Sequence, residues 1–140
     1  MSLQTYHGGC HCGAVRYAVD LDLSQPTIRC NCSLCRKSRA WFAFAPAASF
    51  RLESSGSALA EYRWAPAGKP EPNVTYHFCS RCGVRTHASG TAPDGRRNVA
   101  IQVATLEDAT DRDQLAENIL YVDGLHDRFD RPPDEELKAL

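Results

Sequence analysis

Short stretches with β-strand character follow one another along the chain and are separated by turn residues. Residues 14–19 (AVRYAV) alternate apolar and polar positions, and later runs are rich in β-branched and aromatic residues. We expect strands at residues 14–19, 27–29, 41–44, 50–52, 59–64, 74–78, 98–106 and 119–122. The segments SSGS, APAGKPEP and SGTAPDGRR between them are typical of turns and surface loops.

Helical patterns are weak by comparison. Residues 38–45 are a candidate for one helical turn, and the C-terminal PPDEELKAL, about residues 132–140, predicts a short helix with acidic residues in its first turn. We therefore predict a single mainly β domain over residues 1–140. Its core spans about residues 5–125, and a C-terminal tail follows.

Composition narrows the function classes. The chain has 140 residues and a net charge of −1, which favours small-molecule or protein partners over nucleic acid or anionic membranes. A nucleic-acid binder has little support, because the basic residues are balanced by acids and no recognition helix is evident. The seven cysteines are an odd number, and the first ten residues lack the pattern of a signal peptide. We expect a reducing cytoplasm, where clustered cysteines are mostly metal ligands or catalysts.

Two cysteine pairs form the first candidate metal site. Cys10 and Cys12 lie in GGCHCGAV, and Cys79 and Cys82 lie in FCSRCG. Neighbouring glycines allow the sharp turns that bring two thiolates to one ion, and two such pairs complete a tetrahedral four-thiolate zinc site. Zinc binding there would stabilise the fold. The alternatives are two redox pairs or a disulfide cross-link.

The remaining cysteines, Cys30, Cys32 and Cys35, lie together in RCNCSLCRKSR. A catalytic zinc keeps three protein ligands and leaves one position for water or substrate. Zinc with three negative sulfurs polarises water less well than zinc on three histidines, and it favours a soft ligand such as a substrate thiol. The alternatives are a closed structural site with a histidine or aspartate, an iron–sulfur cluster, or reactive free cysteines.

Other candidate site residues are basic. Arg29, Arg36, Lys37 and Arg39 surround the three cysteines and could bind the carboxylates of a thiol peptide, or they could simply be a solvated surface. Five histidines could in principle supply a fourth ligand: His7, His11, His77, His87 and His126. His11 lies between two proposed ligands, so its side chain should point away from that metal. His77 and His87 lie on strands that flank the second cysteine pair.

In their order, the motifs GGCHCGAVRY, CNCSLCRKS and FCSRCG resemble the glutathione-dependent formaldehyde-activating (GFA) enzyme family, which includes the centromere protein V type. The resemblance implies a β-tent fold. It implies a structural zinc on Cys10, Cys12, Cys79 and Cys82, and a second, catalytic zinc on Cys30, Cys32 and Cys35 at a glutathione site. It also implies a carbon–sulfur lyase that joins glutathione and formaldehyde as S-hydroxymethylglutathione, or releases them.

The chain departs from the family pattern in three places. It reads SRAWFAF where many members have a glycine, and Arg85 and Thr86 follow FCSRCG where an apolar residue is common. Its C-terminal part, ILYVDGLHDRFDRPPDE, contains His126 and Asp127 but no tryptophan. These departures bear on the substrate more than on the fold or metals. The competing hypothesis is a non-catalytic, zinc-stabilised binding or chaperone-like module.

Overall fold

The computed structural model describes residues 3–65, 68–69, 73–108, 115 and 117–134. Within these residues the fold is mainly β, with two sheets and little helix, which includes the short α1 (Ser33–Ser38). Single 3₁₀ turns lie at Ala47–Ser49, Gly56–Ala58, Val103–Thr105 and Gly124–His126. The prediction of a mainly β fold is confirmed. No helix among these residues has the length and apolar character needed to cross a membrane.

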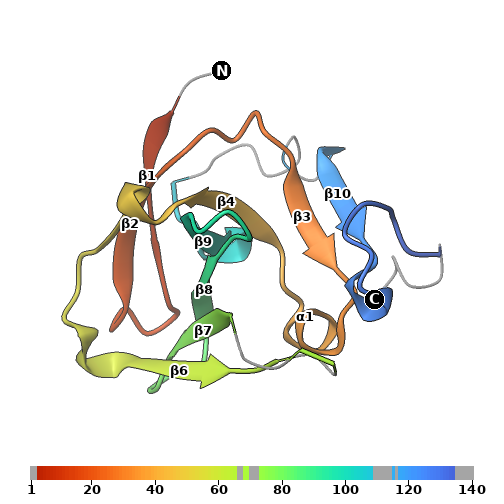
Figure 1. Cartoon of the computed structure of the whole chain (residues 1–140). Helices are drawn as coiled ribbons and strands as arrows, with labels where there is room; N and C mark the ends of the chain where they lie inside the picture. Colours follow the sequence, from red (N-terminus) through yellow and green to blue (C-terminus); the bar gives the residue numbers. More distant parts are fainter. Residues whose placement is uncertain (1–2, 66–67, 70–72, 109–114, 116, 135–140) are drawn as a thin grey trace.

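Seven strands form the larger sheet, in the order β10-β3-β4-β9-β8-β7-β6. Their bounds, in chain order, are β3 Thr27–Cys30, β4 Phe42–Pro46, β6 Leu59–Arg63, β7 Val74–Cys79, β8 Arg85–Thr91, β9 Arg97–Gln102 and β10 Ile119–Val122. All neighbours are antiparallel except β10 and β3, which run parallel. This parallel pair brings the C-terminal part of the chain beside the RCNCSLC segment (Figure 1).

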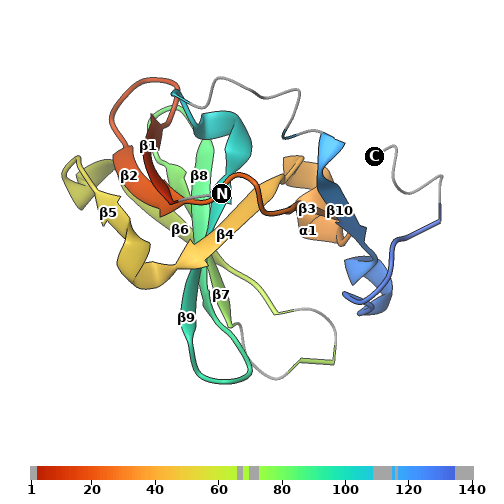
Figure 2. The same cartoon turned by 90° about the horizontal axis from the view of Figure 1, so that it is seen from above.

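The smaller sheet has the order β1-β2-β5 and covers one side of the larger one. Its strands are β1 Gln4–Gly9, β2 Arg16–Leu21 and β5 Phe50–Leu52. Figures 1 and 2 show β1 and β2 lying against β4, β9 and β8. The core between the sheets contains Tyr17, Val19, Leu21, Ala43, Ala45, Val99, Ile101, Val103, Leu106 and Leu115. The opposite face of the larger sheet does not contribute to this core.

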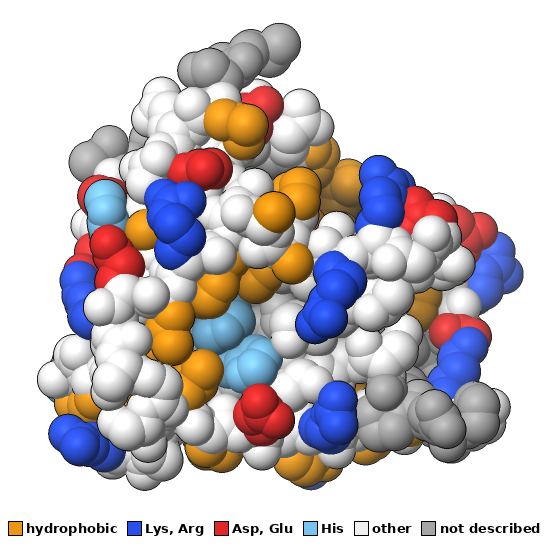
Figure 3. Space-filling model, turned by 60° about the vertical axis from the view of Figure 1, so that its left-hand side comes forward, with side chains coloured by type: hydrophobic (Ala, Val, Ile, Leu, Met, Phe, Trp, Pro, Cys, Tyr) orange, Lys and Arg blue, Asp and Glu red, His pale blue; other side chains and the backbone are white. Residues whose placement is uncertain are grey.

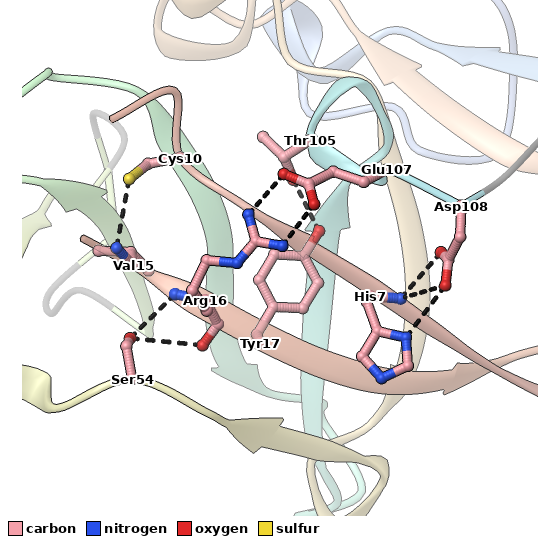
Figure 4. Close-up of polar contacts among 9 residues, drawn as sticks. All are labelled: His7, Cys10, Val15, Arg16, Tyr17, Ser54, Thr105, Glu107 and Asp108. Atoms are coloured by element: carbon pink, nitrogen blue, oxygen red, sulfur yellow. Dashed lines mark hydrogen bonds and ion pairs between the residues drawn. The ribbon is translucent and has the colours of Figure 1, made fainter. Parts of the chain in front are cut away.

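Side-chain contacts tie β1 and β2 to the segment that follows β9 (Figure 4). The hydroxyl of the fully buried Tyr17 lies 2.7 Å from Oγ1 of Thr105. A Cβ on Gly8 would overlap this tyrosine ring, so the close approach requires glycine there. Nearer the surface, Arg16 forms a two-pronged ion pair with Glu107. These contacts hold the smaller sheet in place beside the first cysteine pair.

Most predicted strands are present, with ends shifted by one or two residues. The exception is the predicted strand 98–106, because β9 ends at Gln102 and a 3₁₀ turn follows it. The candidate helical turn at residues 38–45 is wrong: the helix begins five residues earlier, at Ser33, and β4 occupies Phe42–Pro46. Its start is fixed by Cys32, whose sulfur accepts the backbone N–H of Cys35. The predicted C-terminal helix falls mostly on residues 135–140, outside the described chain. The domain bounds remain predictions.

Candidate metal centres

The four-cysteine cluster forms where the turns after β1 and β7 meet. The sulfur of Cys12 lies 3.7 Å from that of Cys10 and 3.7 Å from that of Cys79. With Cys82, all four sulfurs lie within 4.8 Å of one another. A tetrahedral zinc site with Zn–S bonds of about 2.3 Å requires sulfurs about 3.8 Å apart. The spacing of the four sulfurs is thus close to that of a tetrahedral four-thiolate zinc site.

The two turns of this cluster are built alike. The backbone N–H of Cys10 donates to the carbonyl of Val15 at 3.0 Å, and that of Cys79 donates to the carbonyl of Val84 at 3.0 Å. Each turn contains a glycine with a left-handed backbone, Gly13 (φ 87°) and Gly83 (φ 77°). The two loops therefore present their sulfurs in the same way, as the glycine-flanked motifs predict.

Backbone N–H groups favour the thiolate form in this cluster. The N–H of Val15 donates to the sulfur of Cys10 at 3.2 Å (Figure 4). N–H groups of Cys12 and Val84 lower the pKa of Cys82 to about 6. A thiolate is the form that binds a metal ion, so the backbone of both turns prepares the cluster for metal.

The three-cysteine cluster forms within one short segment. Cys30 ends β3, Cys32 caps α1, and Cys35 is buried in the first turns of that helix. Their sulfurs also lie within 4.8 Å of one another. Backbone N–H groups again point at sulfur: Cys32 to Cys30 at 3.4 Å, and Cys35 to Cys32 at 3.3 Å. No histidine, aspartate or glutamate of the described chain joins this cluster as a fourth ligand.

Charge within this cluster is unevenly shared. Contacts with Cys30 and Cys35 lower the pKa of Cys32 to about 2. The pKa of Cys35 is raised by its contacts with Cys30 and Cys32 and by its burial. Without a metal ion, the protein thus favours the thiolate form of Cys32 and disfavours the thiolate form of Cys35. A bound cation would offset this repulsion, so the donor set fits a metal ion with three thiolate ligands.

Residues far along the chain complete the surroundings of this cluster. A Cβ on Gly124 would overlap the sulfur of Cys30, so the segment after β10 lies directly against it. Asn31 holds that segment: its amide donates to the buried carboxylate of Asp123 at 3.0 Å, and its carbonyl oxygen accepts the N–H of Leu125 at 2.9 Å. Sequence reasoning missed Asn31, Asp123 and Gly124. The sequence signal for this segment was the predicted strand at residues 119–122, which indicates that the segment joins the fold.

The four basic residues near the cluster differ in their exposure to solvent. Arg29 is half-buried on β3, whereas Arg36, Lys37 and Arg39 are exposed on or just after α1. No ion pair is recorded for these four within the described chain. Arg39 adopts a left-handed backbone (φ 56°) that ends the helix. A substrate-binding role for the four residues remains a prediction.

The five candidate histidines do not join either cluster. His11 is exposed, and His7 and His126 pair with Asp108 and Asp123. His77 and His87 stack on each other, with ring centroids 4.4 Å apart. On the face shown in Figure 3, histidine side chains lie in a hollow with hydrophobic ones along its upper and left edges. Burial lowers the pKa of His87 to about 3. Among the described residues, the candidate metal ligands are thus cysteines alone.

Fold and clusters together define a class of protein: a mainly β domain with two cysteine clusters that could each hold a metal ion. Residues 5–122 match the family of the glutathione-dependent formaldehyde-activating enzyme, and the chain belongs to this family. The resemblance seen in the three sequence motifs is therefore confirmed.

Two individual proteins are similar to this chain. A Halomonas elongata protein named as a glutathione-dependent formaldehyde-activating enzyme is 38% identical over an alignment of 85 residues, which covers 54% of this chain and 50% of that protein. The chain thus spans about half the length of this curated relative. The crystal structure of a Rhodobacter sphaeroides protein is similar with a TM-score of 0.64 and 30% identity. The matched part covers 77% of this chain and 94% of the Rhodobacter sphaeroides chain.

Proposed function

We propose that this protein is a zinc-dependent carbon–sulfur lyase of the glutathione–formaldehyde type. Its substrates would be a thiol such as glutathione and formaldehyde or another small electrophile. The observation that carries the proposal is the cluster of Cys30, Cys32 and Cys35, which has no fourth protein ligand among the described residues. The family and the name of the Halomonas elongata relative support the same chemistry.

In this proposal the two clusters have different roles. Cys10, Cys12, Cys79 and Cys82 would hold a structural zinc, and Cys30, Cys32 and Cys35 would hold the catalytic one. A zinc ion bound at the second cluster would supply Lewis acidity that favours the thiolate form of a substrate thiol. The protein side of the site consists of the three cysteines, α1 and the segment at Gly124, which positions Cys30.

The proposed reaction is an addition with no net oxidation. In the synthetic direction the sulfur–carbon bond forms, the carbonyl π bond breaks, and the thiol proton ends on the carbonyl oxygen. The reverse direction breaks the carbon–sulfur bond and returns that proton to sulfur. Because no electrons leave the reactants, the reaction requires no redox cofactor. The seven free cysteines of the structure are consistent with the proposed cytoplasmic location.

Calorimetric titration of the zinc-loaded protein with glutathione tests this function. We expect binding to the wild-type protein and its loss in Cys32→Ser, because serine keeps the cap of α1 but not the thiolate ligand. Zinc content should be two equivalents per chain in the wild-type protein and one in Cys32→Ser. Absence of glutathione binding to fully zinc-loaded wild type would contradict the proposal and favour a binding module.

A further inference from the structure

The guanidinium group of Arg85 lies over two neighbouring tyrosine rings. Its central carbon is 5.9 Å from the ring centroid of Tyr62 and 5.6 Å from that of Tyr76. Its Nη1 atom is buried and has no hydrogen-bond partner among the described residues. A buried N–H group of a cation without an acceptor is energetically unfavourable. This arrangement is therefore expected where an anionic group binds.

Strand pairing fixes this arrangement. Tyr62 of β6 pairs with Tyr76 of β7, so their rings lie on one face of the sheet. The register of β7 and β8 shifts between His77 and Phe78, and Phe78 then pairs with Arg85. This irregularity brings the arginine onto the face of the two tyrosines. The arginine is thus placed by the sheet and does not depend on a loop.

The same face of the sheet leads to the three-cysteine cluster. Tyr76 pairs with Ala88, Ala88 with Ala100, and Ala100 with Phe44. On the next strand Ile28 pairs with Phe42, and Cys30 follows two residues later on the same side. Burial raises the pKa of the Tyr76 hydroxyl, and the charges of Cys35, Cys32 and Cys30 raise it further. The arginine and the cluster therefore lie on one continuous surface.

This surface is suited to a small ligand. Opposite the interior shared with the smaller sheet, it carries the exposed side chains of Phe44 and Tyr62. A shallow pocket of about 170 Å³ opens on the same face, lined in part by Phe44 of β4, Ala88 of β8 and Ala100 of β9. The residues at the centre of the sheet on this face, Ala88 and Ala100, have small side chains and add little bulk between the arginine and β4.

We propose that Arg85 binds a carboxylate of the thiol substrate whose sulfur lies at the cluster of Cys30, Cys32 and Cys35. This inference rests on the proposed function and adds a residue that selects charged thiols over neutral ones. The planar guanidinium presents paired N–H donors that match a carboxylate, and it contacts both tyrosine rings. The basic side chains exposed around α1 lack such a fixed geometry.

The test compares ligands that differ in one feature each, titrated into the zinc-loaded protein by calorimetry. Glutathione has both a thiol and carboxylates, glutathione diethyl ester keeps the thiol alone, and S-methylglutathione keeps the carboxylates alone. For Arg85→Gln we expect glutathione and S-methylglutathione to bind about 10- to 100-fold more weakly, the range for a charge-assisted hydrogen bond. The diester should bind equally to both proteins, and Arg85→Lys should recover part of the loss.

A matched control is Arg63→Gln. Arg63 follows Tyr62 on β6, and its guanidinium bonds to Oγ1 of Thr75 at 3.1 Å, away from the proposed surface. This variant should leave all three affinities unchanged. If Arg85→Gln weakened the binding of glutathione and of its diester equally, with zinc content and melting temperature unchanged, the proposed role of Arg85 would be overturned. The proposed function would not be affected by that result. If the wild type bound S-methylglutathione as tightly as glutathione, the free thiol would add nothing to binding. The proposed thiol chemistry would then be contradicted, whereas the anion site at Arg85 would still stand.

Discussion

The two cysteine clusters use the same ligand atoms but join very different parts of the chain. In the first, Cys12 and Cys79 are separated by 67 positions and connect the two sheets' turns. In the second, three cysteines lie within six consecutive residues between β3 and α1. Closing a long loop restricts the unfolded chain far more than closing a short one. Metal binding at the first cluster should therefore stabilise the whole fold, and at the second only its own segment.

The largest expected effect comes from removing one ligand of the first cluster. Cys79 is fully buried, and its cluster packs with Val15 and Ala58. A structural zinc contributes on the order of 10 kcal/mol to folding, comparable to the whole stability of a domain. We expect Cys79→Ser to lose its cooperative thermal transition in circular dichroism.

The matched variant is Cys35→Ser in the second cluster. It should keep a cooperative transition and lose glutathione binding, because its ligands connect no distant segments. Similar losses of thermal stability in both variants would show that the two clusters do not divide structure and catalysis between them.

A smaller effect should separate the clusters during metal removal. The three-cysteine cluster leaves a coordination position to solvent or substrate, whereas four thiolates enclose their ion. With a chromophoric chelator, we expect one equivalent of zinc to be released at least about tenfold faster than the other. Circular dichroism recorded in parallel should change only with the slow phase. A single phase for both ions, accompanied by unfolding, would contradict this order.

The smallest effect concerns the contact between the second cluster and the C-terminal segment. The hydrogen bond from Asn31, together with His126, lowers the pKa of Asp123. A carboxylate with a lowered pKa stabilises the fold above its ordinary value near 3.8, and this contribution disappears as the pH falls through the lowered pKa. We expect Asp123→Asn to lower the melting temperature by roughly 3–6 °C at pH 7.

Asp127→Asn is the control for this variant, since that carboxylate forms an exposed ion pair with Lys69. It should change the melting temperature very little. Asp123→Asn should also speed release of the faster zinc ion, because the segment at Gly124 would no longer be held against Cys30. An unchanged release rate would mean that this segment does not secure the cluster.

Several features of this protein could be read from the sequence because their causes are local. Cysteine spacing and the adjacent glycines determine which sulfurs can meet at a turn, so both clusters were predictable from three motifs. Strands such as β7 were predictable because β-branched and aromatic residues favour them locally. The division of seven cysteines into four and three follows from the same spacing.

Other features depended on tertiary structure. No β-branched or aromatic run predicts β8, whose sequence is RTHASGT; it forms a strand because β7 and β9 supply hydrogen-bond partners on both sides. The contact of Asp123 with Asn31 joins positions 92 residues apart. Arg85 meets Tyr62 and Tyr76 only through strand register and a local irregularity.

The sequence by itself determined the two cysteine clusters that could hold metal ions, because each pair or triplet of cysteines is arranged by the few residues around it. The tertiary structure decided what surrounds the second cluster. Its neighbours include β10 and the segment after it, and only long-range strand pairing brings these beside β3. Local chemistry therefore specified the candidate metal sites, and the folded sheet specified the surface proposed for the substrate.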